Sequence, residues 1–185
     1  WPKGFLARAG IGARGLDLAV EALDPQAVRA ARLVAFSVPM HTALRSAVQA
    51  ARHVRELNPQ AHLSFHGLYA LLNADYLLGE LADSVIGGEC EQTLVALVRD
   101  LAAGGAGRVD GVRTRDHGAG PVIAHLDFPL PDRTGLGPLS RYARLELGSE
   151  TRLAAAVEAS RGCLHSCKHC PIPALYHGRF FAVPV

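Results

Sequence analysis

The chain has 185 residues, of which 49% are hydrophobic and 19% charged, and its formal net charge at pH 7 is +2. This composition is typical of a globular protein rather than a disordered one, and the near balance of 19 basic and 17 acidic residues gives no electrostatic basis for binding nucleic acid. We find no run of about 18 apolar residues and no recognisable signal peptide, and therefore expect no membrane partner. Because the cysteines are clustered rather than spread as a disulfide framework, we expect a reducing, cytoplasmic compartment.

Strands and helices are predicted to alternate from the start of the chain. We expect a strand over 14–20, then a short helix capped by Asp24 with Pro25 in its first position. The apolar run over 32–38 predicts a strand buried on both faces of a parallel sheet. Apolar residues at helical spacing predict a helix over 44–57.

The same alternation continues to about residue 105. Strands are expected in the segments 61–67 and 83–88, and a helix over 89–105. This order predicts an open, mostly parallel, Rossmann-like α/β sheet. Since such sheets usually have about five or more strands, we expect a first strand to precede Trp1.

The pattern changes after the last of these helices. A glycine-rich stretch over 104–121 predicts a small hairpin, the proline-containing stretch over 126–142 predicts an extended connection, and a strand is expected over 157–160. We therefore divide the chain into a Rossmann-like domain over 1–108, a connector over 109–150 and the start of a second domain over 151–185.

Three of the four cysteines lie within eight residues near the end of the chain. Cys163, Cys167 and Cys170 have the spacing Cys-x3-Cys-x2-Cys, and gaps this short let one loop wrap three thiolates around a single centre. An iron–sulfur cluster normally takes four cysteine ligands, so three would leave one iron open to a substrate or cofactor. The spacing favours such a cluster on residues 163–170, which we call the cysteine loop.

Two other interpretations of the cysteine loop stay open. A structural zinc site could combine the three cysteines with His165, His169 or His177, in a non-enzymatic module whose α/β domain binds a ligand or partner. A redox pair would use only Cys167 and Cys170. Zinc ligands usually come as two separated pairs, and a redox pair would leave the third cysteine unused, so both are less favoured than the cluster.

The cysteine loop resembles that of a known enzyme family. The segment "CLHSCKHC" matches the motif of the radical S-adenosylmethionine (radical SAM) enzymes, and "EASRGC" before it is similar to members with an N-terminal cobalamin-binding-like domain. The resemblance implies a 4Fe-4S cluster on the three cysteines, with S-adenosylmethionine on the fourth iron. An electron, supplied by a donor such as flavodoxin or ferredoxin, would cleave that cofactor to a 5'-deoxyadenosyl radical that attacks an unidentified substrate.

The upstream half is similar to the same proteins. The segments "LVAFSVPMHTA" and "GGECEQTL" look like parts of their cobalamin-binding-like domain, and the chain as a whole resembles the CUAEP/CCAEP-tail radical SAM subgroup. The cleft expected to take a cobalamin-type cofactor contains Gly87, Gly88, Glu89 and His66, with the glycines at a helix N-terminus. The Asp-x-His-x2-Gly loop that ligates cobalt in some cobalamin proteins is absent, so cobalamin is a possible cofactor only.

Three smaller expectations complete the sequence-based picture. A radical SAM barrel needs on the order of 200 residues beyond its first strand, so we expect a chain truncated at both ends and inactive by itself. Cys90, at the start of a helix, is expected to be a buried or half-buried residue rather than a ligand. The run from Tyr176 to Arg179, just after the cysteines, could order the cysteine loop or touch the cofactor.

Overall fold

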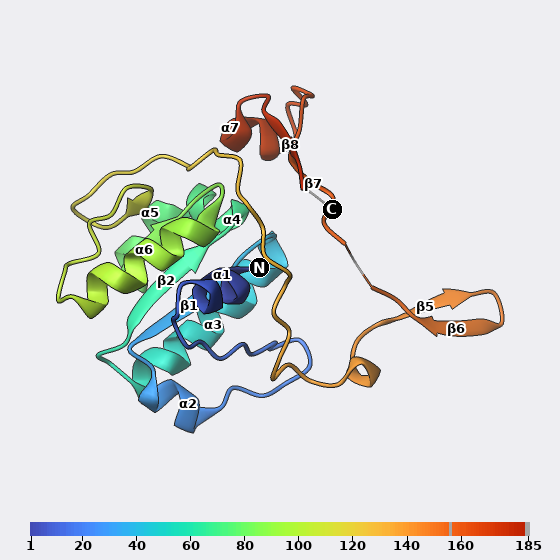
Figure 1. The fold of residues 1–185 in the computed structure, drawn as a ribbon, viewed down its shortest axis with the longest axis horizontal. Helices are drawn as coiled ribbons and strands as arrows, with labels where there is room; N and C mark the ends of the chain where they lie inside the picture. Colours follow the sequence, from blue (N-terminus) through green and yellow to red (C-terminus); the bar gives the residue numbers. More distant parts are fainter. Residues whose placement is uncertain (156, 184–185) are drawn as a thin grey trace.

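Three parallel strands and one antiparallel strand form the central sheet of the protein (Figure 1). The computed structural model describes residues 1–155 and 157–183. Neighbouring strands follow the order β1 (Leu33–Ser37), β2 (His62–His66), β3 (Ser84–Ile86) and β4 (Val112–Arg113). The first three are parallel and β4 runs antiparallel to β3. The fold is therefore mixed α/β with a mostly parallel sheet, as the sequence predicts.

Helices cover both faces of this sheet. On one face, Phe36 of β1 stacks on Phe65 of β2 at 4.8 Å between ring centroids, inside a core that includes buried residues of four helices. These helices are α2 (Pro25–Ala30), α3 (His41–Leu57), α4 (Leu68–Leu72) and α5 (Ala74–Glu80). The second core contains Ile86 of β3 and residues of α1 (Pro2–Arg8) and α6 (Cys90–Ala102). Strands β2 and β3 are almost wholly buried, whereas β1 lies at the edge of the sheet with Ala35 and Ser37 exposed. The expectation that the run 32–38 is buried on both faces is therefore wrong for β1.

The predicted helix boundaries have clear local causes. The Asp24 side chain accepts hydrogen bonds from the backbone N–H groups of Gln26 and Ala27, and Pro25 fills the first position of α2. At the end of α3, the Asn58 side chain donates to the carbonyl oxygens of Val28 and Ala31 at 2.9 Å each. Asn58 thus ties the end of α3 to α2.

The strand predicted over 14–20 is wrong. This segment has no regular structure up to a turn that begins at Leu18. The Asp17 carboxylate accepts from the N–H of Ala19 at 3.0 Å, and the Asp17 carbonyl accepts from Val20 and Glu21. An aspartate that bonds its own downstream backbone favours a turn over a strand ladder.

The segment after α6 also differs from its prediction. The glycine-rich stretch forms no hairpin of its own; its short strand β4 pairs with β3 and completes the main sheet. Helices α1, α4 and α5 were not expected. The last two have five and seven residues and meet at Asn73, so neither is long enough to give a clear helical period.

The rest of the described chain consists of small elements. A 3-10 turn, η1 (Leu139–Arg141), leads to the hairpin β5 (Arg144–Leu147) and β6 (Glu150–Leu153), whose residues are all exposed and which projects from the body in Figure 1. The boundary predicted near residue 150 falls within this hairpin. The described helices include none with the length and hydropathy of a membrane span.

The last unit carries the cysteines. It contains β7 (Ser160–Gly162), α7 (Ile172–Tyr176) and β8 (Phe180–Ala182), with β7 and β8 paired antiparallel. A short strand does precede the cysteines as predicted, although it begins at Ser160 rather than at 157. The described residues contain no barrel.

Candidate functional site

The cysteine loop is closed at its base by the β7–β8 ribbon. The backbone N–H of Cys163 donates to the carbonyl oxygen of Arg179 at 3.0 Å, and the ribbon pairs Gly162 with Phe180. Gly162 has a φ of 78°, and a Cβ there would lie 2.1 Å from that same carbonyl oxygen. Glycine at position 162 is therefore required by both the backbone angle and the close approach of the returning chain.

Alanine at Gly162 is expected to open the base of the loop. The left-handed conformation alone costs an alanine about 1–2 kcal/mol, and the clash with the Arg179 carbonyl adds to this. Gly178 is a matched control, because its φ is also positive at 73° but a Cβ there would have no neighbouring atom within 4 Å. Trypsin should cut at Lys168 several-fold faster in Gly162→Ala than in Gly178→Ala; equal rates would contradict this account of the loop base.

The three clustered cysteines are free thiols with different exposure. Cys163 and Cys170 are half-buried and Cys167 is exposed. The loop has little internal bonding: the N–H of Cys170 donates to the Cys167 carbonyl at 3.2 Å, and the N–H of His165 lies 3.5 Å from the Cys163 sulfur. Accessible thiols on a lightly bonded loop are chemically suited to accept a metal or cluster.

The sulfurs are not gathered around one point in this structure. In residues 1–155 and 157–183, no three His, Cys, Asp or Glu side chains lie together in a way that could hold a metal ion. His165, His169 and His177, the alternative zinc ligands, are all exposed. The three-thiol donor set fits an iron–sulfur cluster in chemistry, and the loop would have to close around it on loading.

A buried ionic cluster holds the unit formed by β7, α7 and β8 against the main sheet. The Arg161 guanidinium donates to Glu91 through both terminal nitrogens, at 2.6 and 3.0 Å, and to Glu89 at 2.7 Å. It also contacts Glu158 at 3.2 Å, and the Tyr176 hydroxyl donates to Glu89 at 3.0 Å. We call these five residues the Arg161 cluster. The cluster joins β7 and α7 to the first turn of α6, about 70 positions earlier in the chain.

The centre of the Arg161 cluster is well shielded from water, while Glu158 at its edge is 46% exposed. The side chains of Glu89 and Glu91 are each 2% exposed and that of Arg161 is 12% exposed. The guanidinium lies 4.7 Å from the Phe128 ring centroid and 5.4 Å from that of Trp1. Burial raises the pKa of Glu89, against the lowering effect of its bond to Arg161.

The structure places His66 beside Cys90, the first residue of α6. The Cys90 sulfur lies 3.4 Å from Nδ1 of His66, and both residues are buried, as expected for Cys90. Burial lowers the pKa of His66 to about 4 and raises that of the Cys90 thiol. A neutral imidazole and an un-ionised thiol form a packed pair with no free nucleophile.

The buried imidazole predicts a pH dependence of stability. Between the ordinary value of 6.5 and about 4, the unfolded chain takes up a proton at His66 that the native chain does not. Stability is therefore lost as the pH falls through this window, by about 3 kcal/mol between pH 7 and pH 4. The raised pKa of Glu89 acts in the opposite direction. Urea unfolding at both pH values should give a correspondingly smaller acid loss in His66→Asn than in the wild type; an identical loss would contradict the prediction.

The two glycines predicted to approach a cofactor are covered by the chain itself. Gly88 forms an isolated parallel β-bridge with Val122. A Cβ on Gly88 would lie 2.0 Å from the Val122 carbonyl oxygen. A Cβ on Gly87 would lie 2.3 Å from a methyl carbon of Leu71. Glu89 in turn bonds Arg161. The structure thus brings Gly87, Gly88, Glu89 and His66 to one sheet edge but fills the space beside them, so these residues do not fit a bound cobalamin.

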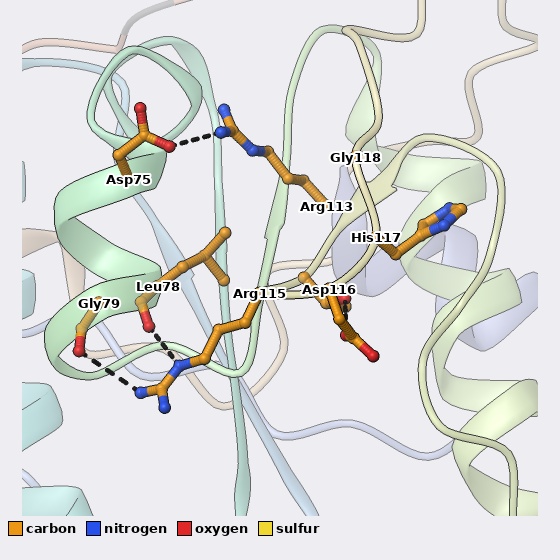
Figure 2. A pocket seen from close by; sticks show the side chains of 9 residues that line it. Asp75, Leu78, Gly79, Arg113, Arg115, Asp116, His117 and Gly118 are labelled. Atoms are coloured by element: carbon orange, nitrogen blue, oxygen red, sulfur yellow. Dashed lines mark hydrogen bonds and ion pairs between the residues drawn. The ribbon is translucent and has the colours of Figure 1, made fainter.

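A pocket of about 480 Å³ lies elsewhere, between α5 and the segment after β4 (Figure 2). Its two arginines are already engaged: Arg113 pairs with Asp75, and Arg115 donates to the carbonyl oxygens of Leu78 at 2.6 Å and Gly79 at 3.5 Å. No cysteine and none of the predicted site residues line it. The pocket offers no group for the chemistry of the cysteine loop.

Known proteins add no further information on this site. Comparisons of the chain with family models, curated proteins and solved structures find no match. The residue that sequence reasoning missed is Arg161: its position two residues before Cys163 was visible, but its pairing with Glu91 was not.

Proposed function

We propose that this chain is part of a radical SAM enzyme whose cysteine loop holds a 4Fe-4S cluster on Cys163, Cys167 and Cys170. The observation that carries the proposal is the donor set: three free thiols within eight residues, none of them in a disulfide and one of them exposed. A cluster on three cysteines keeps one iron open to a cofactor. The resemblance of "CLHSCKHC" to the radical SAM motif implies S-adenosylmethionine as that cofactor.

Support also comes from the position of the loop in the fold. The Arg161 cluster ties the unit that carries the cysteine loop to the first turn of α6, directly after β3. This is the carboxyl edge of the parallel strands, where open α/β proteins build their binding sites. We infer a Rossmann-like accessory domain that supports a catalytic unit, in a cytoplasmic enzyme served by an electron donor such as flavodoxin or ferredoxin.

Each part of the chain has a distinct role in this proposal. When bound, the cluster supplies a low-potential electron to S-adenosylmethionine. The thiolates of the loop hold it, Gly162 allows the tight return of the chain at the loop base, and Arg161 connects the loop to the sheet. Cobalamin has no part in the proposal, because Val122, Leu71 and Arg161 occupy its expected site.

Binding of S-adenosylmethionine to the cluster tests the proposal. In the anaerobically reconstituted and reduced chain, addition of S-adenosylmethionine should shift the electron paramagnetic resonance signal of the cluster. S-adenosylhomocysteine is added in a parallel sample as the comparison ligand. The variant lacking His165, His169 and His177 should behave as the wild type. A signal that does not respond to S-adenosylmethionine, or a metal lost with the three histidines, would reject the proposal.

A further inference from the structure

The Arg161 cluster contains more buried negative charge than positive charge. Glu89 and Glu91 are almost fully buried, and the only guanidinium that contacts them in the described chain comes from β7 of the cysteine-bearing unit. Each buried carboxylate would be costly without a partner, so the first turn of α6 requires a cation to cover it. The chain itself provides that cation, two residues before the first cysteine of the loop.

The chemistry of the two partners is well matched. Both terminal nitrogens of Arg161 bond the two oxygens of Glu91, in the bidentate arrangement that fixes orientation as well as distance. Phe128 and Trp1 lie against the guanidinium, so its position is also defined by packing. A lysine could supply the charge but not this geometry.

A second contact comes from the far side of the loop. Tyr176 at the end of α7 donates to Glu89, and Leu175 beside it is 3% exposed. The cysteine loop is thus held at both ends, by Arg161 before it and by Tyr176 after it. The same two carboxylates make the N-terminus of α6 unsuited to an anionic ligand, because like charges would repel it.

We propose that Arg161 is the positioning residue of the cysteine loop, and that Glu89 and Glu91 form a receptor on the accessory domain that fixes where the loop lies. The role of the loop in holding a cluster rests on the proposed function, but the positioning does not. The carboxyl edge of the sheet then serves as a support for the chain's own catalytic loop instead of as a cofactor site. The group bound at this edge is the Arg161 guanidinium of the same chain.

Hydrogen exchange tests the proposal in a way that separates positioning from charge neutralisation. In Arg161→Met with Glu89→Gln and Glu91→Gln, no uncompensated buried charge remains, because the only carboxylate left in the cluster is that of Glu158, which is 46% exposed. The parallel strands should therefore keep their protection. The hydrogen-bonded backbone amides around the cysteine loop, those of Cys163, Cys170, His177 and Arg179, should nevertheless exchange at least about tenfold faster than in the wild type. Arg152→Met is the matched control, because Arg152 pairs only with the exposed Glu150 among the described residues, and it should change neither region.

Each outcome decides the question. Faster exchange confined to the loop supports positioning by Arg161. If the loop amides of the triple variant stay as protected as in the wild type, Arg161 only neutralises buried charge and the proposal is overturned. Visible circular dichroism of the reconstituted chain adds a cluster readout, which should change in the triple variant and not in Arg152→Met. A wild-type chain that binds no cluster would reject the proposed function, while the exchange result would still decide the positioning.

Discussion

Replacement of Arg161 by methionine is expected to lower the free energy of unfolding by about 3–5 kcal/mol, because it leaves buried carboxylates without their cation. Glu89 and Glu91 are each 2% exposed and have no other guanidinium within contact in the described chain. The methionine keeps much of the packing against Phe128, so the loss reports mainly on charge. Urea unfolding monitored by circular dichroism measures it.

Two further variants serve as controls for Arg161→Met. Arg152→Met should change the unfolding free energy by less than about 1 kcal/mol, because exposed ion pairs contribute little. Adding Glu89→Gln and Glu91→Gln to Arg161→Met should restore most of the lost stability, since removal of a whole buried ion network is often close to neutral. A small effect of Arg161→Met alone would mean that the cluster is open to water in solution.

The second large effect concerns the cysteines. Alanine at Cys163, Cys167 or Cys170 is expected to abolish iron binding, because each removes one of only three protein ligands and leaves two irons of the cluster without protein support. The measurement is iron per chain after anaerobic reconstitution. Cys90→Ala is the matched control: Cys90 is a buried thiol that contacts His66, so its replacement should leave the iron content unchanged.

The pattern of results also separates the cluster from its alternatives. A redox pair would tolerate alanine at Cys163 without loss of its chemistry, which needs only Cys167 and Cys170. A zinc site of three cysteines and a histidine would lose its metal when His165, His169 and His177 are replaced together. Retention of iron in any single cysteine variant would contradict the three-ligand account.

The parallel sheet could be predicted from the sequence because strand-like segments alternate with amphipathic helices. The apolar run 32–38 indicates β1, although Ala35 and Ser37 of this edge strand are exposed, and Asp24 with Pro25 marks the start of α2 through local bonds alone. The strand expected over 14–20 failed for a local reason as well, since Asp17 bonds the backbone of Ala19 and makes a turn. The pairing of β4 with β3 depends on contacts far apart in the sequence, which a local pattern does not contain.

The candidate site could also be predicted only in part. The three cysteines are close in sequence, so their spacing could be read directly, together with the glycine that precedes them. The pairing of Arg161 with Glu91 spans 70 positions and depends on how β7 lies against α6. Sequence reasoning therefore identified Glu89 as a residue of the sheet edge but assigned it to a cofactor, where the structure gives it an arginine and a tyrosine.

Metal analysis of the anaerobically reconstituted chain decides whether the cysteine loop holds a cluster, with iron, acid-labile sulfide and zinc measured together with a visible spectrum. We expect about four irons and four sulfides per chain, with broad visible absorption that disappears when any one of the three cysteines is replaced. Stoichiometric zinc with no visible absorption would contradict it and favour a structural site.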